Sequence, residues 1–280
     1  MVKKALLIGI NYKDTDNELY GCINDITNIN NFLVNNCLYN SSNIKVLTDD
    51  SDTKPTFLNI KEQINWLISN TVSGDTLIFY YSGHGSYIRD RNGDESDARD
   101  EIIVPLNYDT GGFITDDWLF TNMISKIPAN VTLWCFTDCC HSGTIADLKY
   151  NYRSNSSLKK GKTVINNSYV SSDWTDKFSL SLEKSTNILG KVYLFSGCRD
   201  TETSADAYIN KTSQGAFTFC LLEFLKKNIC NTSKRFLNGT VKLRNVLKEI
   251  NCRLDINGFT EQNSQLSLCK QEDFEKTIDF

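Results

Sequence analysis

The chain has 280 residues and a mass of 31.8 kDa, and its 30 basic and 34 acidic residues give a net charge of −4. A hydrophobic content of 40% is enough for a sizeable core and excludes a wholly disordered chain. No apolar run reaches the roughly 18 residues of a membrane-spanning helix, and the mild negative charge does not support nucleic-acid binding. We therefore expect neither a membrane nor a nucleic acid as a partner.

Short apolar runs alternate with segments of helical periodicity along the chain. The first run, residues 5–10, follows two lysines as in a signal peptide, but no small-residue cleavage site follows it, so we predict a buried strand. Apolar residues then recur at three- and four-residue spacing over 23–33, which is typical of an amphipathic helix. Further strands are predicted at 44–47, 76–81, 131–136 and 192–195, and further helices at 55–68, 215–226 and 241–254.

This alternation of strands and helices predicts an α/β fold in which helices flank a mostly parallel central sheet. Residues 149–184 break the alternation, because they are polar and rich in Ser, Asn and Lys. A loop of that length inside a compact domain is usually functional or mobile. No repeat and no clear boundary divides the chain, so we expect a single domain over residues 1–280.

The ten cysteines do not form a recognisable disulfide or zinc-binding pattern. The chain is far longer than small disulfide-stapled domains, shows no secretory signal and contains no Cys-x-x-Cys pair. Reduced thiols are typical of cytoplasmic or nuclear proteins, so we expect a cytoplasmic or nuclear protein that is not secreted.

The two histidines, His84 and His141, each follow a predicted strand in a glycine-flanked turn. Active sites of parallel sheets lie at the carboxyl ends of strands, and a thiol nucleophile needs a histidine as its proton partner. Each histidine taken alone is also compatible with an ordinary loop residue. Because Cys139, Cys140 and His141 are consecutive, they lack the spacing of zinc ligands. Spacing leaves open which cysteine is the nucleophile.

Several motifs together resemble those of the metacaspases, which are cysteine peptidases of the caspase-like fold. Ser-Gly-His-Gly at 82–85, taken with Asp-Cys-Cys-His-Ser-Gly at 138–143, is similar to metacaspase sequences. The likeness continues at 9–12 and 19–25 in the first strand and loop, at 100–105 in an Asp-Glu-x-Ile-x-Pro element, and at 196–200, 203–206 and 215–217 in the small-subunit region.

The resemblance covers nearly the whole chain. It implies a large-subunit-like region at about 1–148, a linker loop at 149–184 and a small-subunit-like region at 185–280. The chain starts almost at the first strand, so we expect a catalytic domain without a long N-terminal prodomain. Metacaspases are typically monomeric, and the resemblance therefore implies a monomer.

The resemblance also implies the catalytic residues. Cys140 matches the nucleophile and His84 its general acid and base, whereas Cys139 is a neighbour at a position where the family carries Ser or Cys. The backbone N–H groups of Gly85 and Cys140 would form the oxyanion hole. The thiolate would attack the scissile carbonyl, and the histidine would protonate the leaving amine.

The residue before the scissile bond is expected to be Arg or Lys. Asp138 lies two residues before the nucleophile, and Asp25 matches the second acidic position of the family's specificity pocket, which Cys22 and Ser82 also line. Two carboxylates would bind a basic side chain by charge-assisted hydrogen bonds. Taken alone, Asp25 is also compatible with a helix-capping residue. The expected partners are peptides or proteins with exposed Arg or Lys.

An acidic loop at 90–101 imitates an EF-hand but has Glu95 where that loop requires Gly, so we reject an EF-hand. The resemblance implies a different Ca²⁺ site, in which a hard cation relieves the repulsion between converging carboxylates. Asp116 and Asp117 are also compatible with the N-cap of a helix over 118–127. The implied ligands are Asp100, Asp116, Asp117 and Asp147.

The linker loop contains Lys159, Lys160 and Lys162, an exposed basic run that a peptidase with an acidic pocket could cut. We therefore predict self-cleavage there, with a plain solvated linker as the alternative. The expected activity is that of a calcium-activated cysteine endopeptidase cleaving after Arg or Lys. The alternatives are a non-catalytic calcium-binding or protein-quality-control factor on the same fold, and a peptidase specific for Asn or Asp.

Overall fold

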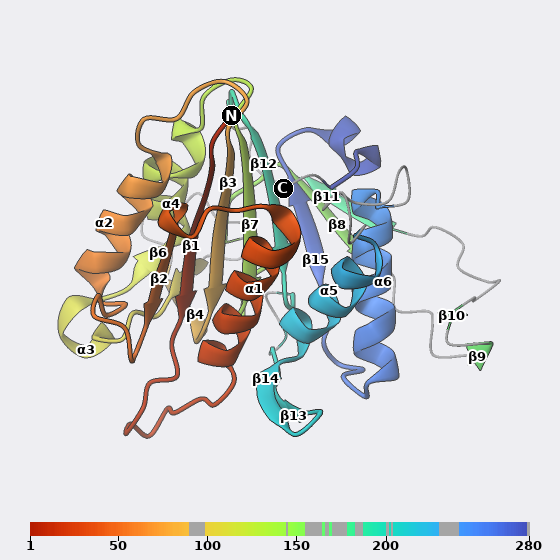
Figure 1. Cartoon of the computed structure of the whole chain (residues 1–280), viewed down its shortest axis with the longest axis horizontal. Helices are drawn as coiled ribbons and strands as arrows, with labels where there is room; N and C mark the ends of the chain where they lie inside the picture. Colours follow the sequence, from red (N-terminus) through yellow and green to blue (C-terminus); the bar gives the residue numbers. More distant parts are fainter. Residues whose placement is uncertain are drawn as a thin grey trace.

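The computed structural model describes residues 1–89, 99–143, 145–154, 164–165, 168–169, 178–182, 187–199, 202, 204–229 and 241–278. Within them, an eight-stranded sheet forms the centre of the fold, in the order β11-β8-β15-β12-β7-β3-β1-β2 (Figure 1). The parallel strands are β1 (Lys3–Gly9), β2 (Ile44–Thr48), β3 (Thr76–Ser82), β7 (Thr132–Asp138) and β12 (Lys191–Ser196). The strands β15 (Gln265–Leu268), β8 (Tyr150–Ser154) and β11 (Phe178–Leu182) are paired antiparallel.

A layer of helices covers each face of this sheet (Figure 1). One layer contains α1 (Cys22–Cys37), α5 (Ala216–Lys227) and α6 (Leu243–Ile256), and the other contains α2 (Phe57–Ile68) and α4 (Asp116–Asn122). Leu7 and Tyr80 belong to the core under the first layer, whereas Leu6 and Phe79 belong to the core under the second. Because both faces are buried, the central parallel strands β1, β3, β7 and β12 are mostly apolar runs in the sequence.

Three smaller β structures lie beyond the main sheet in the described residues, including the pair of two-residue strands β9 (Val164–Ile165) and β10 (Ser168–Tyr169). A three-stranded sheet of β4 (Gly85–Arg89), β5 (Arg99–Ile103) and β6 (Ile114–Thr115) begins directly after β3. A hairpin of β13 (Asp206–Ile209) and β14 (Thr212–Gly215) leads into α5. The other short elements are α3 (Tyr108–Gly111) and 3₁₀ turns at Ser41–Asn43, Ile124–Lys126 and Gln271–Glu275.

The predicted α/β fold is confirmed, with a mixed, mostly parallel sheet between two helical layers. The five strands that the apolar runs predicted correspond to β1, β2, β3, β7 and β12. The helix considered at 118–127 is a shorter α4 that begins at Asp116 and is followed by a 3₁₀ turn.

Residues 149–184, expected as a linker loop, differ from that expectation, because β8 and β11 lie within them and extend the main sheet. Tyr152 of β8 is buried in the core, and the Nε of Arg153 donates a hydrogen bond to Oε1 of Gln265 at 2.6 Å. Polar groups on neighbouring strands thus satisfy one another here. Because hydrogen-bonded polar side chains occupy these positions, the sequence lacks the aliphatic run that would predict a buried strand.

Candidate active site

The site forms where two neighbouring parallel strands end. Ser82, the last residue of β3, pairs with Asp138, the last residue of β7, and the backbone N–H of Gly83 donates to the Asp138 carbonyl at 3.3 Å. The chain then brings His84 and Cys140 to the same cavity of about 130 Å³. Cys22, Asp25, Ser82 and Asp138 line this cavity too, so the residues predicted for catalysis and specificity lie together. We call it the acidic cavity.

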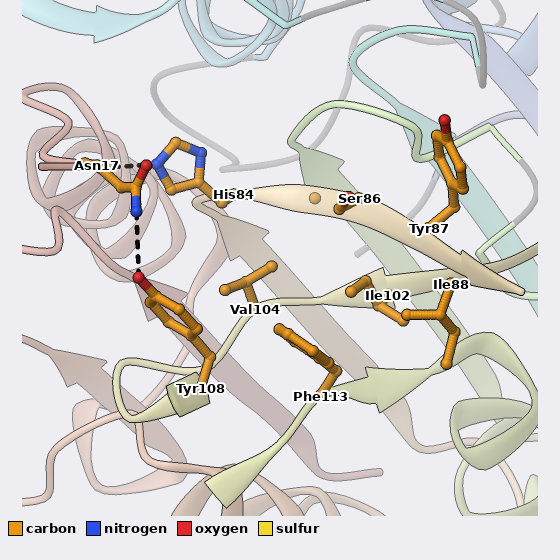
Figure 2. Close-up of a pocket in the computed structure, with 10 residues that line it drawn as sticks. Asn17, His84, Ser86, Tyr87, Ile88, Ile102, Val104, Tyr108 and Phe113 are labelled. Carbon is orange, nitrogen blue, oxygen red and sulfur yellow. Dashed lines mark hydrogen bonds between the residues drawn. The ribbon is translucent and has the colours of Figure 1, made fainter. Parts of the chain in front are cut away.

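Four hydrogen-bonding and ring contacts hold His84. Its Nε2 lies 2.7 Å from the carbonyl oxygen of Asn17, as Figure 2 shows. Because a carbonyl oxygen only accepts, Nε2 carries a proton, and Nδ1 is the nitrogen left for proton transfer. The backbone N–H of His84 donates to Oη of Tyr12 at 3.1 Å, Oη of Tyr81 donates to the His84 carbonyl at 2.6 Å, and the Tyr12 ring lies 4.7 Å from the imidazole.

His141, the other histidine, has a different environment. Its ring packs edge to face against Tyr87, with 5.2 Å between the ring centroids. It does not line the acidic cavity, so the geometry favours His84 as the proton carrier.

The structure also distinguishes the two adjacent cysteines, which spacing could not. Cys139 is 1% exposed and belongs to the core under α2 and α4, whereas Cys140 is half-buried and lines the acidic cavity. Burial raises the pKa of both thiols, and a hydrogen bond with the backbone of Ser204 partly opposes the rise in the pKa of Cys140. Only Cys140 combines access to a ligand with a nearby imidazole.

Gly85 lies in close contact with the backbone of Cys140. A Cβ atom at this position would overlap the carbonyl oxygen of Cys140 and lie 3.0 Å from Sγ of Cys139. Glycine is therefore required for the two backbone segments to approach, and an oxyanion hole made of two backbone N–H groups needs such an approach.

Two buried carboxylates form the acidic end of the cavity. Asp25 is 0% exposed and accepts hydrogen bonds from Oγ of Ser82 at 2.8 Å and from the backbone N–H of Gly215 at 2.9 Å. Asp138 accepts from the backbone N–H and Oγ1 of Thr218 at 2.9 and 2.7 Å, and from Oγ of Ser204. These donors fix the position of both carboxylates.

Electrostatics make the carboxylates of Asp25 and Asp138 a site for a cation. Burial raises the pKa of both, and their hydrogen-bond donors oppose that rise. Repulsion from Asp138 raises the pKa of Asp25 further. Among the described residues, no ion pair involves either one. A positively charged ligand group would relieve the unfavourable burial of charge.

Six residues of the cavity were not predicted as site residues, among them Ser204, Asp206 and Gly215. A Cβ at Gly215 would overlap Oδ2 of Asp138 and lie 2.7 Å from Oδ2 of Asp25, so glycine alone fits between the carboxylates. Asp206 accepts the backbone N–H of Tyr20 at 2.6 Å. These three residues belong to the motifs at 203–206 and 215–217 that the resemblance had included, which was the available signal.

Three of the four predicted calcium ligands form a cluster beside β5. One carboxylate oxygen from each of Asp100, Asp116 and Asp117 lies within 4.8 Å of the others. Asp116 is 1% exposed, and burial raises its pKa to about 7, although the backbone N–H groups of Asp117 and Glu101 donate to it at 2.7 and 2.8 Å. Buried oxygen donors that repel one another fit a hard divalent cation.

The other predictions have separate outcomes. Asp147 is not a member of the carboxylate cluster. Thr115 caps α4 through its Oγ1, so Asp116 and Asp117 begin the helix and do not cap it. Lys159, Lys160 and Lys162 lie outside the described residues. No helix in the described ranges is long and apolar enough to cross a membrane.

Comparison with known proteins identifies relatives over most of the chain. A family model described as "Metacaspase, peptidase C14 domain" matches residues 3–149. Metacaspase-1 of Candida albicans is 36% identical over 281 residues, covering 88% of this chain and 62% of that protein. Metacaspase-1 of Arabidopsis thaliana is 35% identical over 236 residues, covering 82% and 61%. The chain thus spans less than two thirds of the length of these two relatives.

A solved structure shares the fold. The crystal structure of a protein from Geobacter sulfurreducens superposes with a TM-score of 0.65 at 21% identity and covers 99% of this chain and 97% of its own. At that identity the likeness concerns the fold alone.

Proposed function

The chain belongs to the metacaspase family, and we propose that it is a cysteine endopeptidase that cleaves after Arg or Lys. The observation that carries this proposal is the acidic cavity, which Cys140, His84 and two buried aspartates line together. A thiol, an imidazole and a cation-binding pocket in one cavity are the parts that such a reaction needs.

Proton transfer begins the reaction. Burial raises the pKa of the Cys140 thiol, so the thiol needs a base, and Nδ1 of His84 is the nitrogen left to take its proton. The carbonyl of Asn17, which holds Nε2–H, then stabilises the imidazolium and fixes its orientation. The thiolate adds to the scissile carbonyl carbon.

The later steps depend on backbone N–H groups, on His84 and on water. The N–H groups of Gly85 and Cys140 would stabilise the negative oxygen of the tetrahedral intermediate. His84 gives its proton to the leaving amine as the C–N bond breaks, and a thioester to Cys140 remains. Water then attacks the thioester carbon while His84 takes a water proton, the C–S bond breaks to release the carboxylic acid product, and the imidazolium returns its proton to the Cys140 thiolate.

Specificity for a basic residue follows from the buried carboxylates. An Arg or Lys side chain in the acidic cavity would pair with Asp25 and Asp138, whose desolvation is only partly offset by their hydrogen-bond donors. An Asp side chain there would add a further negative charge to a cavity that already has three aspartates, and an Asn side chain would leave Asp25 and Asp138 without a cation. These considerations favour Arg and Lys over the alternative specificity for Asn or Asp.

Calcium dependence is part of the proposal. Asp100, Asp116 and Asp117 would hold the ion, and Asp147 stays a predicted fourth ligand. A bound calcium ion would neutralise the cluster. The cluster connects β5 to the start of α4, because Asp100 is part of β5 and Asp116 accepts the backbone N–H of Glu101. Strand β5 pairs with β4, which begins at Gly85. Calcium binding that fixes the position of β5 would therefore also fix the position of Gly85 in the proposed oxyanion hole.

Cleavage of a fluorogenic peptide ending in Arg tests this function, with calcium compared with excess chelator. We expect calcium-dependent release that Cys140→Ala abolishes. Cys252→Ala, which alters a half-buried cysteine on α6, is the matched control and should retain activity. Absence of release from Arg and Lys peptides, with calcium binding retained, would instead favour the non-catalytic calcium-binding role.

A further inference from the structure

A second cavity, of about 400 Å³, lies beside the imidazole of His84 (Figure 2). Its lining shares His84 with the acidic cavity and no other residue. The chain passes from one cavity to the other at this residue, since Ser82 and Gly83 line the acidic cavity and Gly85 and Ser86 line the second. The imidazole therefore stands between the two cavities.

The second cavity has an apolar wall, and Asn17, Ser86, Tyr87 and Tyr108 add polar groups to its lining. Ile88 on β4, Ile102 on β5, and Val104 and Phe113 after β5 contribute hydrophobic side chains that converge in Figure 2. Tyr108 stacks on Phe113 with 6.2 Å between the ring centroids. None of the lining residues is charged, in contrast to the three aspartates of the acidic cavity.

Part of this apolar surface is open to solvent. Phe113 is 39% exposed, and the Tyr108 hydroxyl accepts a hydrogen bond from Nδ2 of Asn17 at 3.1 Å at the end nearest His84. A cavity of this size with apolar walls and a few polar groups at one end is typical of a binding site for a side chain or small ligand.

From this arrangement we infer that the second cavity binds the substrate residue that directly follows the scissile bond and selects a large apolar side chain there. The inference rests on the proposed peptidase function. The acidic cavity takes the residue before the bond, and His84 protonates the amine that begins the segment after it. That segment must leave the imidazole away from the buried aspartates, and the second cavity lies beside the imidazole and contains none of those aspartates. Leu, Ile, Phe and Tyr fit its walls, whereas Asp or Glu would lose hydration without a partner.

The test uses internally quenched peptides that contain one Arg and differ only in the next residue, which is Leu, Phe, Gly or Asp. We expect kcat/KM to be about tenfold or more higher for Leu and Phe than for Gly or Asp. Phe113→Ala should reduce the ratio of Leu to Gly, and Phe113→Arg should raise the ratio of Asp to Leu. Leu189→Ala, at an exposed residue just before β12, should change neither ratio.

The outcomes separate the two proposals. If none of the peptides is cut, the peptidase proposal fails. If they are all cut after Arg within about twofold of one another, the enzyme proposal stands and the second cavity has no role in selecting this residue. If the Phe113 variants slow all peptides equally, Phe113 only supports the fold, and the inference is overturned. A purely structural role of Phe113 would not explain faster cleavage of the Asp peptide by Phe113→Arg.

Discussion

The phenol oxygen of Tyr12 accepts the backbone N–H of His84 at 3.1 Å, and its ring lies 4.7 Å from the imidazole at an interplanar angle of 38°. The same hydroxyl donates to the carbonyl of Val104 at 2.6 Å. Burial raises the pKa of Tyr12 well above its ordinary value, so this hydroxyl stays protonated. Tyr12 therefore connects the turn that carries His84 to the segment after β5, and we expect it to position the imidazole.

Tyr12→Phe should lower kcat about tenfold, which corresponds to roughly 1.4 kcal/mol of lost positioning, while KM stays within about twofold. The ring contact is kept, but the His84 N–H loses its acceptor, and the Val104 carbonyl keeps only the longer hydrogen bond from Tyr81 at 3.3 Å. Steady-state kinetics with an Arg peptide measure both constants. Tyr39→Phe, at a buried tyrosine outside the acidic cavity, is the control and should change neither. A lower melting temperature with unchanged kcat would refute the positioning role.

Asp138→Asn should have opposite effects on activity and stability. Cleavage after Arg should fall about 100-fold, because a charged hydrogen bond worth roughly 1.5–3 kcal/mol is lost. Burial raises the pKa of Asp138 in the folded state, so the folded protein holds this proton more tightly than the unfolded chain does. The wild type therefore loses stability as pH rises through the folded pKa, and the variant escapes that loss.

Thermal unfolding at about pH 4, near the ordinary pKa of an aspartate, and at about pH 8 checks the stability half of this prediction. The melting temperature should fall less with pH in Asp138→Asn than in the wild type. Asp50→Asn alters an exposed aspartate that pairs with Lys13 and is the matched control. Unchanged cleavage after Arg in Asp138→Asn would show that the acidic cavity does not bind the basic side chain.

Sequence patterns predicted the parallel half of the sheet because the central strands β1, β3, β7 and β12 are buried on both faces and are therefore mostly apolar. Strand β15 shows why the rest was missed. Gln265 and Ser267 are fully buried there, and both donate to the carbonyl of Gly143, at 2.7 and 3.2 Å. A hydrogen bond to a residue more than a hundred positions away leaves no local periodicity, so tertiary contacts override the pattern.

Some residues of the candidate site could likewise be predicted from the sequence, whereas others could not. His84 and Cys140 follow apolar strands and carry recognisable chemistry, so the sequence makes both of them candidates, and the family resemblance favours Cys140 over Cys139. Asn17 contributes only its backbone carbonyl to the imidazole, and a carbonyl is present in every residue. Asp206 reaches the acidic cavity from the hairpin before α5 and contacts the backbone of Tyr20. Neither contact can be inferred from residue type and spacing, because each depends on how distant loops meet.

Calcium affinity should depend on pH with a midpoint near the pKa of Asp116. Burial raises that pKa to about 7, so a proton competes with the cation below that pH. About one tenth of the carboxyl is ionised at pH 6 and about nine tenths at pH 8, so binding should be roughly tenfold tighter at pH 8. Titration calorimetry at both pH values measures the difference.

Two variants control the calcium experiment. Asp116→Asn should remove the pH dependence and most of the affinity, whereas Asp109→Asn changes an exposed aspartate on α3 and should leave both unchanged. Equal affinity at the two pH values in the wild type would mean that Asp116 is not a ligand.

Self-cleavage is expected at the Lys-Lys-Gly-Lys sequence of residues 159–162, because these side chains match the acidic cavity. Incubation with calcium should give an N-terminal fragment that ends at Lys159, Lys160 or Lys162, as read by intact-mass spectrometry. Replacing all three by Gln removes the charge that Asp25 and Asp138 would bind, so the fragment should disappear while cleavage of an added Arg peptide persists.

The matched triple variant replaces Lys211, Lys226 and Lys227, which are exposed on the β13–β14 turn and at the end of α5, and it should still be cut. Cys140→Ala incubated alone should remain intact, because it lacks the nucleophile. If that inactive chain is cut when wild type is added, one molecule can cleave another. A fragment that forms in the Lys159, Lys160 and Lys162 triple variant, or an intact wild type that still cleaves the Arg peptide, would show that this sequence is not a site of self-cleavage. In the second case the peptidase acts without it, because the acidic cavity and the Cys140 thiol are already assembled in the uncut chain.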